Sequence, residues 1–207
     1  MPRLVLLSDT HRMHDKIVIP DGDIVVHAGD FCGHGTSKQA RAFAQFFRAL
    51  PHRHKVVIAG NHDRCLELEP SLGPEIFAGC HYLFDSGVEI EGLRFWGSPW
   101  QPWFLDWAFN LQRGPALQAK WDLIPNNTDV LVTHGPPRAI LDRTFLGENV
   151  GCDDLRAAVE RIRPRLHVFG HIHEGYGEYE AEGTRFVNAS ICTLSYEPTN
   201  PAIVVDL

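Results

Sequence analysis

The sequence predicts an α/β fold in a single domain spanning residues 1–207. Short runs rich in Val, Ile and Leu recur along the whole chain, and amphipathic helical patterns lie between several of them. The chain has 207 residues, of which 44% are hydrophobic and 22% charged, so it can bury a sizeable core and has the composition of an ordinary globular protein.

Five short runs are typical of buried strands because they are apolar and rich in β-branched residues. They cover residues 3–8, 23–29, 55–60, 129–134 and 166–170. Residues 37–50 predict a helix with Ser37 as its N-cap and an apolar stripe that includes Phe43 and Phe47. Residues 152–162 predict a second helix, with acids in its first turn and Pro164 beyond its end.

The later apolar runs follow one another without long helices between them. They cover residues 81–85, 87–92, 93–97, 183–190 and 201–207, and they favour a second, more antiparallel sheet. Residues 97–128 are rich in Pro, Trp and Gln and predict a long loop or cap with a helix near 115–122.

Composition restricts the partners and the compartment. The net charge of -7 disfavours a long nucleic acid as a partner. No stretch approaches the roughly 20 apolar residues that cross a bilayer, and the apolar run at the N-terminus is too short for a signal peptide. Five cysteines without a Cys-x-x-Cys pair favour reduced thiols and a cytoplasmic location. The oligomeric state stays open.

Each of the five early runs ends in Asp, Asn or His. Because sites in α/β sheets form at the carboxyl ends of strands, these side chains are expected to converge. The set is Asp9, His11, Asp30, Asn61, His134, His171 and His173. The i, i+2 spacing of the first and last pairs lets both members point the same way.

Imidazole and carboxylate ligands without thiolate suit Mn²⁺, Fe or Zn²⁺. Seven ligands are too many for one tetrahedral ion, so the sequence predicts two divalent ions, with manganese expected first. Asp30 stands alone after its strand and is the predicted bridge between them. His167 lies too far back along its strand and is expected in the core.

The pattern D-x-H, G-D, G-N-H-D, H and G-H-x-H, from Asp9 to His173, resembles the calcineurin-like metallophosphoesterases. The stretches GSPWQPWF, THGPP and HVFGHIHEGYG are similar to the metallophosphoesterase-domain-containing subfamily and, through it, to class III cyclic-nucleotide phosphodiesterases. The resemblance implies a four-layer α/β/β/α sandwich of two mixed sheets.

The resemblance also implies a role for each site residue. One metal would be held by Asp9, His11, Asp30 and His173, and the other by Asp30, Asn61, His134 and His171. His62 would be the catalytic histidine. Asp63 would either orient His62 or cap the helix that starts at Arg64, and the sequence does not choose between these two roles.

The expected activity is hydrolysis of small phosphodiesters, with cyclic nucleotides as candidates. A metal-bridging hydroxide would attack phosphorus while His62 assists the leaving group. A phosphomonoesterase or protein phosphatase with the same metal core is the alternative, and a non-catalytic scaffold is a further one. His34 is a candidate phosphate contact. Trp100 and Trp103 are candidates for stacking on a base, although tryptophans in this segment could instead fill a core.

Overall fold

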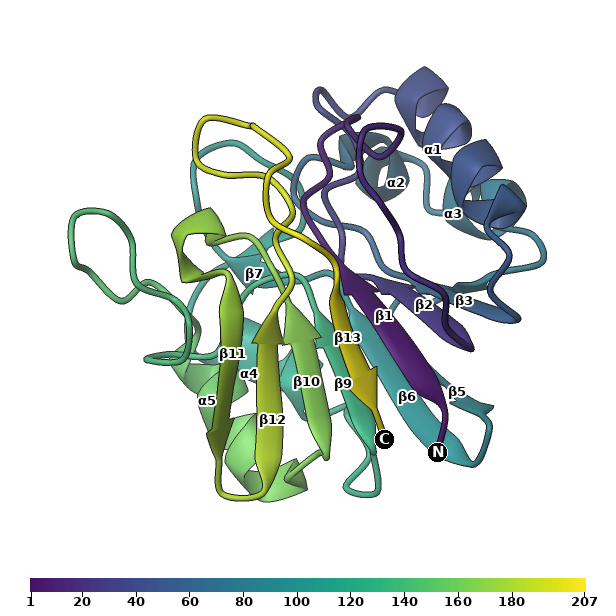
Figure 1. Ribbon diagram of the computed structural model, residues 1–207. Helices are drawn as coiled ribbons and strands as arrows, with labels where there is room; N and C mark the ends of the chain where they lie inside the picture. The colour runs from purple at the N-terminus through teal and green to yellow at the C-terminus, as the bar shows by residue number, and fades with distance from the viewer.

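The computed structural model describes residues 1–207 and places two sheets face to face (Figure 1). The first sheet has the order β13 (Ile203–Asp206), β1 (Arg3–Leu7), β2 (Ile24–His27), β3 (His54–Val57) and β4 (His81–Tyr82). The second has the order β11 (Gly177–Ala181), β12 (Thr184–Asn188), β10 (Leu166–Phe169), β9 (Val130–Thr133), β6 (Leu93–Ser98) and β5 (Ser86–Ile90). A separate two-stranded ribbon joins β7 (Gln101–Pro102) to β8 (Asn110–Leu111).

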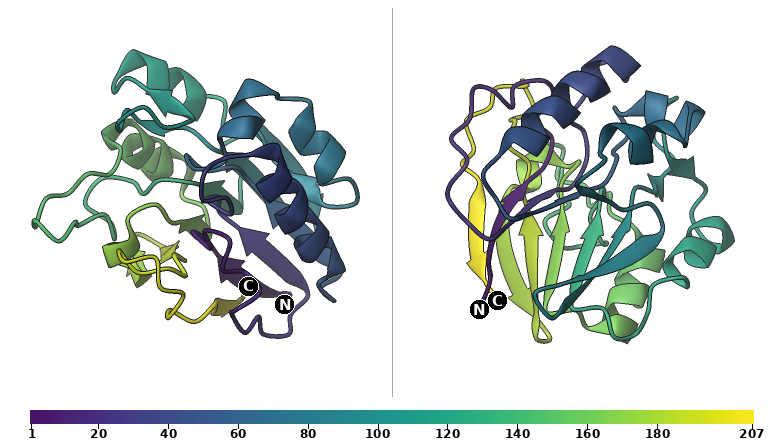
Figure 2. Two further views of the ribbon diagram at one scale, coloured as in Figure 1. Left: turned by 90° about the horizontal axis from the view of Figure 1, so that it is seen from above. Right: turned by 90° about the vertical axis from the view of Figure 1, so that its right-hand side faces the viewer.

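Helices cover the outer face of each sheet. They are α1 (Ser37–Ala49), α2 (Arg64–Leu68) and α3 (Leu72–Ile76) on the first sheet, and α4 (Pro115–Trp121) and α5 (Asp153–Ile162) on the second. A short 3₁₀ turn, η1 (His173–Gly175), follows β10. Figure 2 shows the two groups of helices on opposite sides of the sheets. The predicted four-layer α/β/β/α sandwich is confirmed.

The expectation of a second, more antiparallel sheet was only partly correct. Both sheets are mixed: β6, β9, β10 and β12 pair in parallel at the centre of the second sheet, and antiparallel strands flank them. Parallel neighbours need a crossover connection, and α4 and α5 lie in the connections from β6 to β9 and from β9 to β10. Two of the five early runs therefore belong to the second sheet.

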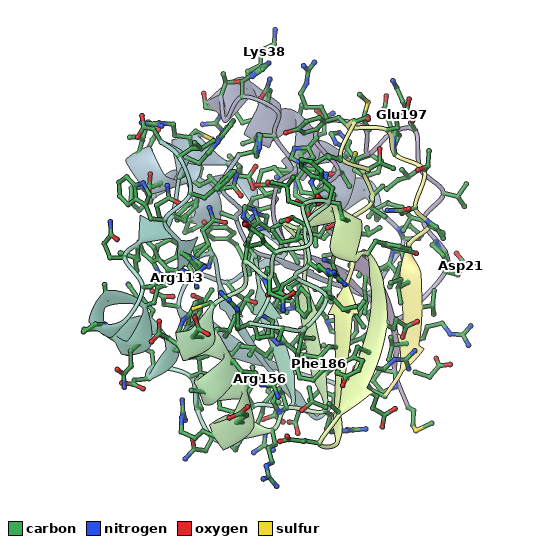
Figure 3. All side chains as sticks on the ribbon, turned by 90° about the vertical axis from the view of Figure 1, so that its left-hand side faces the viewer. Asp21, Lys38, Arg113, Arg156, Phe186 and Glu197 are labelled. Carbon is green, nitrogen blue, oxygen red and sulfur yellow. The ribbon has the colours of Figure 1, made fainter.

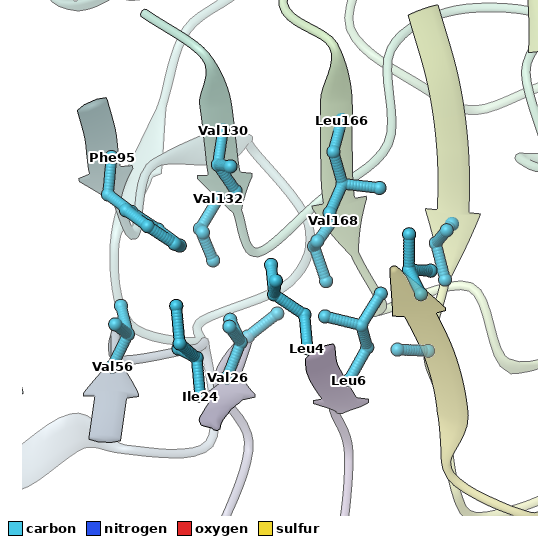
Figure 4. Close-up of a cluster of buried hydrophobic side chains, with 14 of the residues drawn as sticks. Leu4, Leu6, Ile24, Val26, Val56, Phe95, Val130, Val132, Leu166 and Val168 are labelled. Carbon is cyan, nitrogen blue, oxygen red and sulfur yellow. The ribbon is translucent and has the colours of Figure 1, made fainter. Parts of the chain in front are cut away.

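Strand alternation creates three apolar layers. On β1, Leu4 and Leu6 enter the core between the two sheets, whereas Val5 and Leu7 pack under α1–α3. Figure 4 shows the central layer, where Val26 of β2 lies across from Val132 of β9 and Val168 of β10. A third layer fills the space between the second sheet and α4 and α5.

The helices begin close to their predicted boundaries. Thr36, rather than the predicted Ser37, caps α1, because its Oγ1 accepts a hydrogen bond from the Gln39 amide at 3.3 Å. Cys152 caps α5 through its Sγ, which accepts from the Leu155 amide. None of the helices combines the length and the apolar composition that crossing a membrane requires.

Candidate metal centre

The loops that leave β1, β2, β3, β9 and β10 meet at one end of the two sheets. In Figure 1, β10 and β12 run upward toward these loops. The loops bring together the predicted ligands Asp9, His11, Asp30, Asn61, His134, His171 and His173. Asp9 and His134 are fully buried and Asp30 is 2% exposed.

Asp9, His11 and His173 form the first half of the cluster. His173 Nε2 lies 3.3 Å from Asp9 Oδ1 and 3.3 Å from His11 Nε2. His11 Nε2 is 3.8 Å from the same oxygen. Ligand atoms bound at about 2.0–2.1 Å to one tetrahedral ion are roughly 3.3–3.4 Å apart, so this spacing matches a shared cation.

Asp30, His134 and His171 form the second half. His134 Nε2 lies 3.4 Å from Asp30 Oδ2 and 2.8 Å from Asn61 Oδ1. The same Asp30 oxygen is 3.9 Å from His11 Nε2, in the first half. Asp30 therefore lies between the two halves, and His171 and His173 fall on different ones.

The donor atoms fit divalent cations. Asp9 Oδ1 is buried and accepts no hydrogen bond, which is costly unless a cation or another partner faces it. The histidines His11, His134 and His173 each place Nδ1 2.9 to 3.2 Å from a backbone carbonyl oxygen. Donation from Nδ1–H to the carbonyl leaves the Nε2 lone pair directed into the cluster, as in metal sites generally.

The buried carboxylates and imidazoles of the cluster compensate one another's charges. Burial alone would raise the pKa of Asp9, but the imidazole of His173, with Nε2 3.3 Å from Asp9 Oδ1, holds it well below its usual value. Burial opposes protonation of His134 and His173, yet Asp30 and Asp9 raise their pKa values to about 9. Below that pH, cations entering the cluster must displace these protons, so metal uptake is expected to release protons.

Four of the predicted ligands have a strained backbone. Asp9, His11, Asp30 and His171 have φ values of 52°, 40°, 59° and 67°, in the left-handed region that residues with a Cβ rarely adopt. Such strain costs of order 1–3 kcal/mol per residue and persists where surrounding structure enforces it. Each ligand is thereby aimed into the cluster at the end of its strand.

Two glycines allow the backbone to approach the buried carboxylates. A Cβ on Gly170 would lie 1.9 Å from Asp9 Oδ2, and one on Gly60 would lie 2.4 Å from Asp30 Oδ1. At these distances any side chain would displace the carboxylate. The glycines before His171 and Asn61 are therefore required by the packing of the cluster.

Asp63 neither orients His62 nor caps α2, the two roles expected from the sequence. Its carboxylate makes no hydrogen bond to His62 and none that caps α2. Instead it accepts from the backbone N–H groups of Asp30, Cys32 and Gly60 at 2.9, 2.9 and 2.8 Å. Burial and the charge of Asp30 raise the pKa of Asp63 to about 8. Asp63 thus ties the loop after β2 to the loop after β3.

His62 is next to the cluster, and its imidazole lies close to His11 and Asp30. Its Nδ1 lies 2.9 Å from the Gly33 carbonyl oxygen, and its Nε2 lies 4.0 Å from Asp30 Oδ2. The ring of Trp107 covers it at a centroid distance of 4.0 Å and an interplanar angle of 31°. The carbonyl and the indole fix the imidazole, with Nε2 free on the side of the cluster.

Above the cluster is an open cleft of about 520 Å³, on whose floor His62, His171 and His173 lie. Its walls are largely apolar, and the largest apolar side chains come from three loops. They include Trp103 and Phe104 of the β7–β8 loop, Phe145 and Leu146 of the loop before α5, and Leu194 and Tyr196 of the loop before β13. The loop before α5 projects at the left of Figure 1.

The three residues predicted to contact the substrate lie in different environments. Trp103 lines the cleft and is 57% exposed. Trp100 does not line it: its Nε1 donates to Asp85 at 2.9 Å and its ring packs against Phe84 and Phe109. His34 is exposed on a loop outside the cleft.

Sequence reasoning missed the aromatic residues nearest the cluster. The ring of Tyr196 lies 4.8 Å from that of His11, and the ring of Phe104 lies 5.9 Å from that of His171. Trp107 contacts His62. All three are in loops without a periodic pattern, and only the concentration of tryptophans in residues 96–107 signalled a special role for that segment.

The fold and the site define a metal-dependent phosphoesterase. Residues 2–175 match the model of the calcineurin-like phosphoesterases, and the chain belongs to this family. It is 46% identical over 230 aligned residues to metallophosphoesterase domain-containing protein 1 of Homo sapiens, covering 99% of this chain and 71% of that protein.

Solved structures share the fold at low sequence identity. The protein TT1561 of Thermus thermophilus superposes with a TM-score of 0.59 at 12% identity, covering 90% of this chain and 88% of that one. A structure described as a novel archaeal phosphodiesterase has a TM-score of 0.51 at 18% identity and covers 99% of this chain and 93% of that one. At these identities the likeness supports the fold alone.

Removal of Asp30 is expected to cost more metal than removal of Asp9. Asp30 lies between the two halves of the cluster, whereas Asp9 groups as a possible metal ligand only with His11 and His173 of the first half. Metal analysis of purified Asp30→Ala should find neither ion at full occupancy, and Asp9→Ala should keep the ion of the second half. A full pair of ions in Asp30→Ala would exclude the bridging position.

Replacement of Asp63 should weaken the site without removing a metal ligand. The substitution Asp63→Asn replaces one of the two acceptor oxygens with an NH₂ group, which cannot accept a hydrogen bond from a backbone amide. Each amide left without an acceptor should destabilise the fold by about 1–3 kcal/mol. Urea unfolding should show this loss, and metal analysis should show reduced occupancy. Asp106→Asn, at a side chain that is 93% exposed, is the control; equal behaviour of the two variants would contradict the role.

Proposed function

We propose that this protein is a metal-dependent phosphodiesterase that hydrolyses small phosphodiesters, with cyclic nucleotides as the substrate class. The observation that carries the proposal is a cluster with a shared carboxylate, Asp30, at the floor of a cleft with apolar walls. The floor suits phosphate held by cations. The walls offer apolar surface to the organic groups on either side of a diester. A protein phosphatase would have less need of such a surface.

The residues can hold two divalent cations, for which manganese is the proposed identity. The cluster residues would hold them as two sets that share Asp30. Bound there, the cations would supply Lewis acidity toward the phosphate and an activated water. The chain itself contributes the surrounding negative charge of Asp9 and Asp30 and the exclusion of bulk water from the buried half of the site.

His62 is the proposed proton donor to the leaving oxygen. Its Nδ1–H donates to the Gly33 carbonyl oxygen, so a second proton on Nε2 points toward the cleft floor. In the protonated form, Nε2–H can pass its proton to the departing alkoxide. Trp107 limits rotation of the imidazole and keeps this nitrogen directed toward the substrate.

The proposed substrates are small, and long nucleic acids are not among them. The net charge is -7, and the cleft wall carries Glu148 and Glu174. A polyanionic strand would be repelled over its length by such a surface. A single phosphate held by the cations would not meet this repulsion over a long surface.

Rates on an aryl phosphodiester and on the matching aryl phosphomonoester test the proposal. With Mn²⁺ added, the diester should be hydrolysed faster, and a strong chelator should abolish both activities. Faster turnover of the monoester would replace the proposal with a phosphomonoesterase. No turnover of either, in a protein shown to contain two metals, would favour a non-catalytic scaffold.

Loss of the His62 imidazole should affect kcat and not metal binding. His62→Ala is expected to keep both ions and to lose ~10²–10⁴-fold in kcat, the usual contribution of a general acid. The loss should be smaller for a nitrophenolate leaving group than for an alkoxide, because nitrophenolate needs little protonation. Equal losses for both leaving groups would argue against proton donation.

Trp103 and Trp100 provide a matched pair for base stacking. Stacking is worth about 1–3 kcal/mol, so Trp103→Ala should raise KM for a cyclic nucleotide by roughly 5- to 150-fold. It should leave a small diester without a base nearly unchanged. Trp100→Ala should instead lower the melting temperature, because Trp100 packs against two of the core layers. Equal KM increases on both substrates in Trp103→Ala would contradict stacking.

A further inference from the structure

The charged residues on the cleft wall are few and mostly acidic. Beyond the metal cluster and its histidines, the ionisable carboxylates and cations that line the cleft are Arg113, Glu148 and Glu174. The rest of the wall is apolar or uncharged. A ligand phosphate outside the cluster would therefore depend on Arg113 for positive charge.

Arg113 is engaged elsewhere. Its Nη1 donates to the Gly151 carbonyl oxygen and its Nη2 to the Val150 carbonyl oxygen, each at 2.7 Å. Nη1 also lies 3.6 Å from the Asp153 carboxylate. Figure 3 shows Arg113 near the start of α4. The guanidinium thus holds the base of the loop before α5, and part of its charge is offset by Asp153.

The two glutamates carry uncompensated negative charge. Both are exposed, and neither forms an ion pair. Glu174 Oε1 accepts a hydrogen bond from the Phe145 amide at 3.0 Å, which places this carboxylate against the loop before α5. Glu148 lies on the same loop, near the Arg143–Asn149 bridge. The acidic groups therefore border the cleft beside its apolar walls.

We propose that the cleft selects ligands with a single phosphate and that Glu148 and Glu174 disfavour nucleoside diphosphates and other polyphosphates. The inference rests on the proposed function and narrows its substrate class. When the terminal phosphate of a nucleoside diphosphate is on the cations and the organic group lies against the apolar wall, the inner phosphate lies between them. There it would meet two unpaired carboxylates and, as the one cation of the wall, an arginine already bound to two carbonyl oxygens and close to Asp153, so the negative charge of the wall would oppose it.

Calorimetric binding of AMP and ADP to the metal-loaded protein tests the proposal without turnover. ADP is expected to bind at least about tenfold more weakly than AMP, which corresponds to about 1.4 kcal/mol. The difference should shrink as salt is raised, since exposed charges are screened. The titrations are done without excess free cation, and the metal content of the protein is measured after each one. A loss of metal would show that ADP has chelated it.

The double variant Glu148→Gln with Glu174→Gln should bring the two affinities together, largely through tighter ADP binding. Glutamine keeps an oxygen that can accept from the Phe145 amide, so the loop contact survives. Glu180→Gln is the matched control, because Glu180 is exposed on β11 and outside the cleft. ADP binding as tightly as AMP in the native protein, or unchanged discrimination in the double variant, would overturn the proposal.

Inorganic phosphate and pyrophosphate separate this inference from the proposed function. If AMP binds no more tightly than phosphate, the apolar wall contributes nothing and the nucleotide assignment fails. In that case phosphate should still bind more tightly than pyrophosphate if the acidic wall discriminates. Pyrophosphate binding at least as tightly as phosphate, with the metals retained, would overturn the single-phosphate selection alone.

Discussion

The burial of two carboxylates, Asp9 and Asp30, is the constraint from which the rest of the site follows. Asp9 is fully buried and Asp30 is 2% exposed. An isolated charge at such a position costs many kcal/mol, so the protein must surround it with cations or protonated groups. The imidazoles of His134 and His173, from the loops after β9 and β10, help to meet this need, and divalent cations would meet it more completely.

Bringing those groups to one point strains the backbone of the loops that carry them. Asp9, Asp30 and His171 have left-handed backbones, and Gly60 and Gly170 lie against the carboxylates with no room for a side chain. Asp63 holds the loops after β2 and β3 together by accepting hydrogen bonds from three amides. Cations beside Asp30 would offset the repulsion between the two aspartates and lower the pKa of Asp63, so metal binding should also strengthen this link.

Much of this arrangement could be predicted from the sequence, because each ligand directly follows a strand that is recognisable by its apolar residues. Alternation along those strands also determines the three layers of the core. The role of Asp63 could not be predicted, since it depends on two loops becoming neighbours through the sheet. Trp100 and Trp103 both lie beside prolines, and tertiary contacts with Asp85, Phe84 and Phe109 pack Trp100 against the core. His34 follows Asp30 closely, but the loop carries it out to solvent before Gly35 turns the chain at φ 66°.

The same contrast separates the metal cluster from the walls of the cleft. The floor of the cleft consists of residues at strand ends, whose positions are fixed by the packing of two sheets. The walls consist of residues such as Trp103, Phe145 and Leu194, which lie in loops and are 54 to 71% exposed. Loops of this kind accept substitutions that leave the sheets and the ligands intact. Substrate preference in this fold is therefore a property of a few exposed apolar and acidic side chains, and it can change while the metal cluster stays the same.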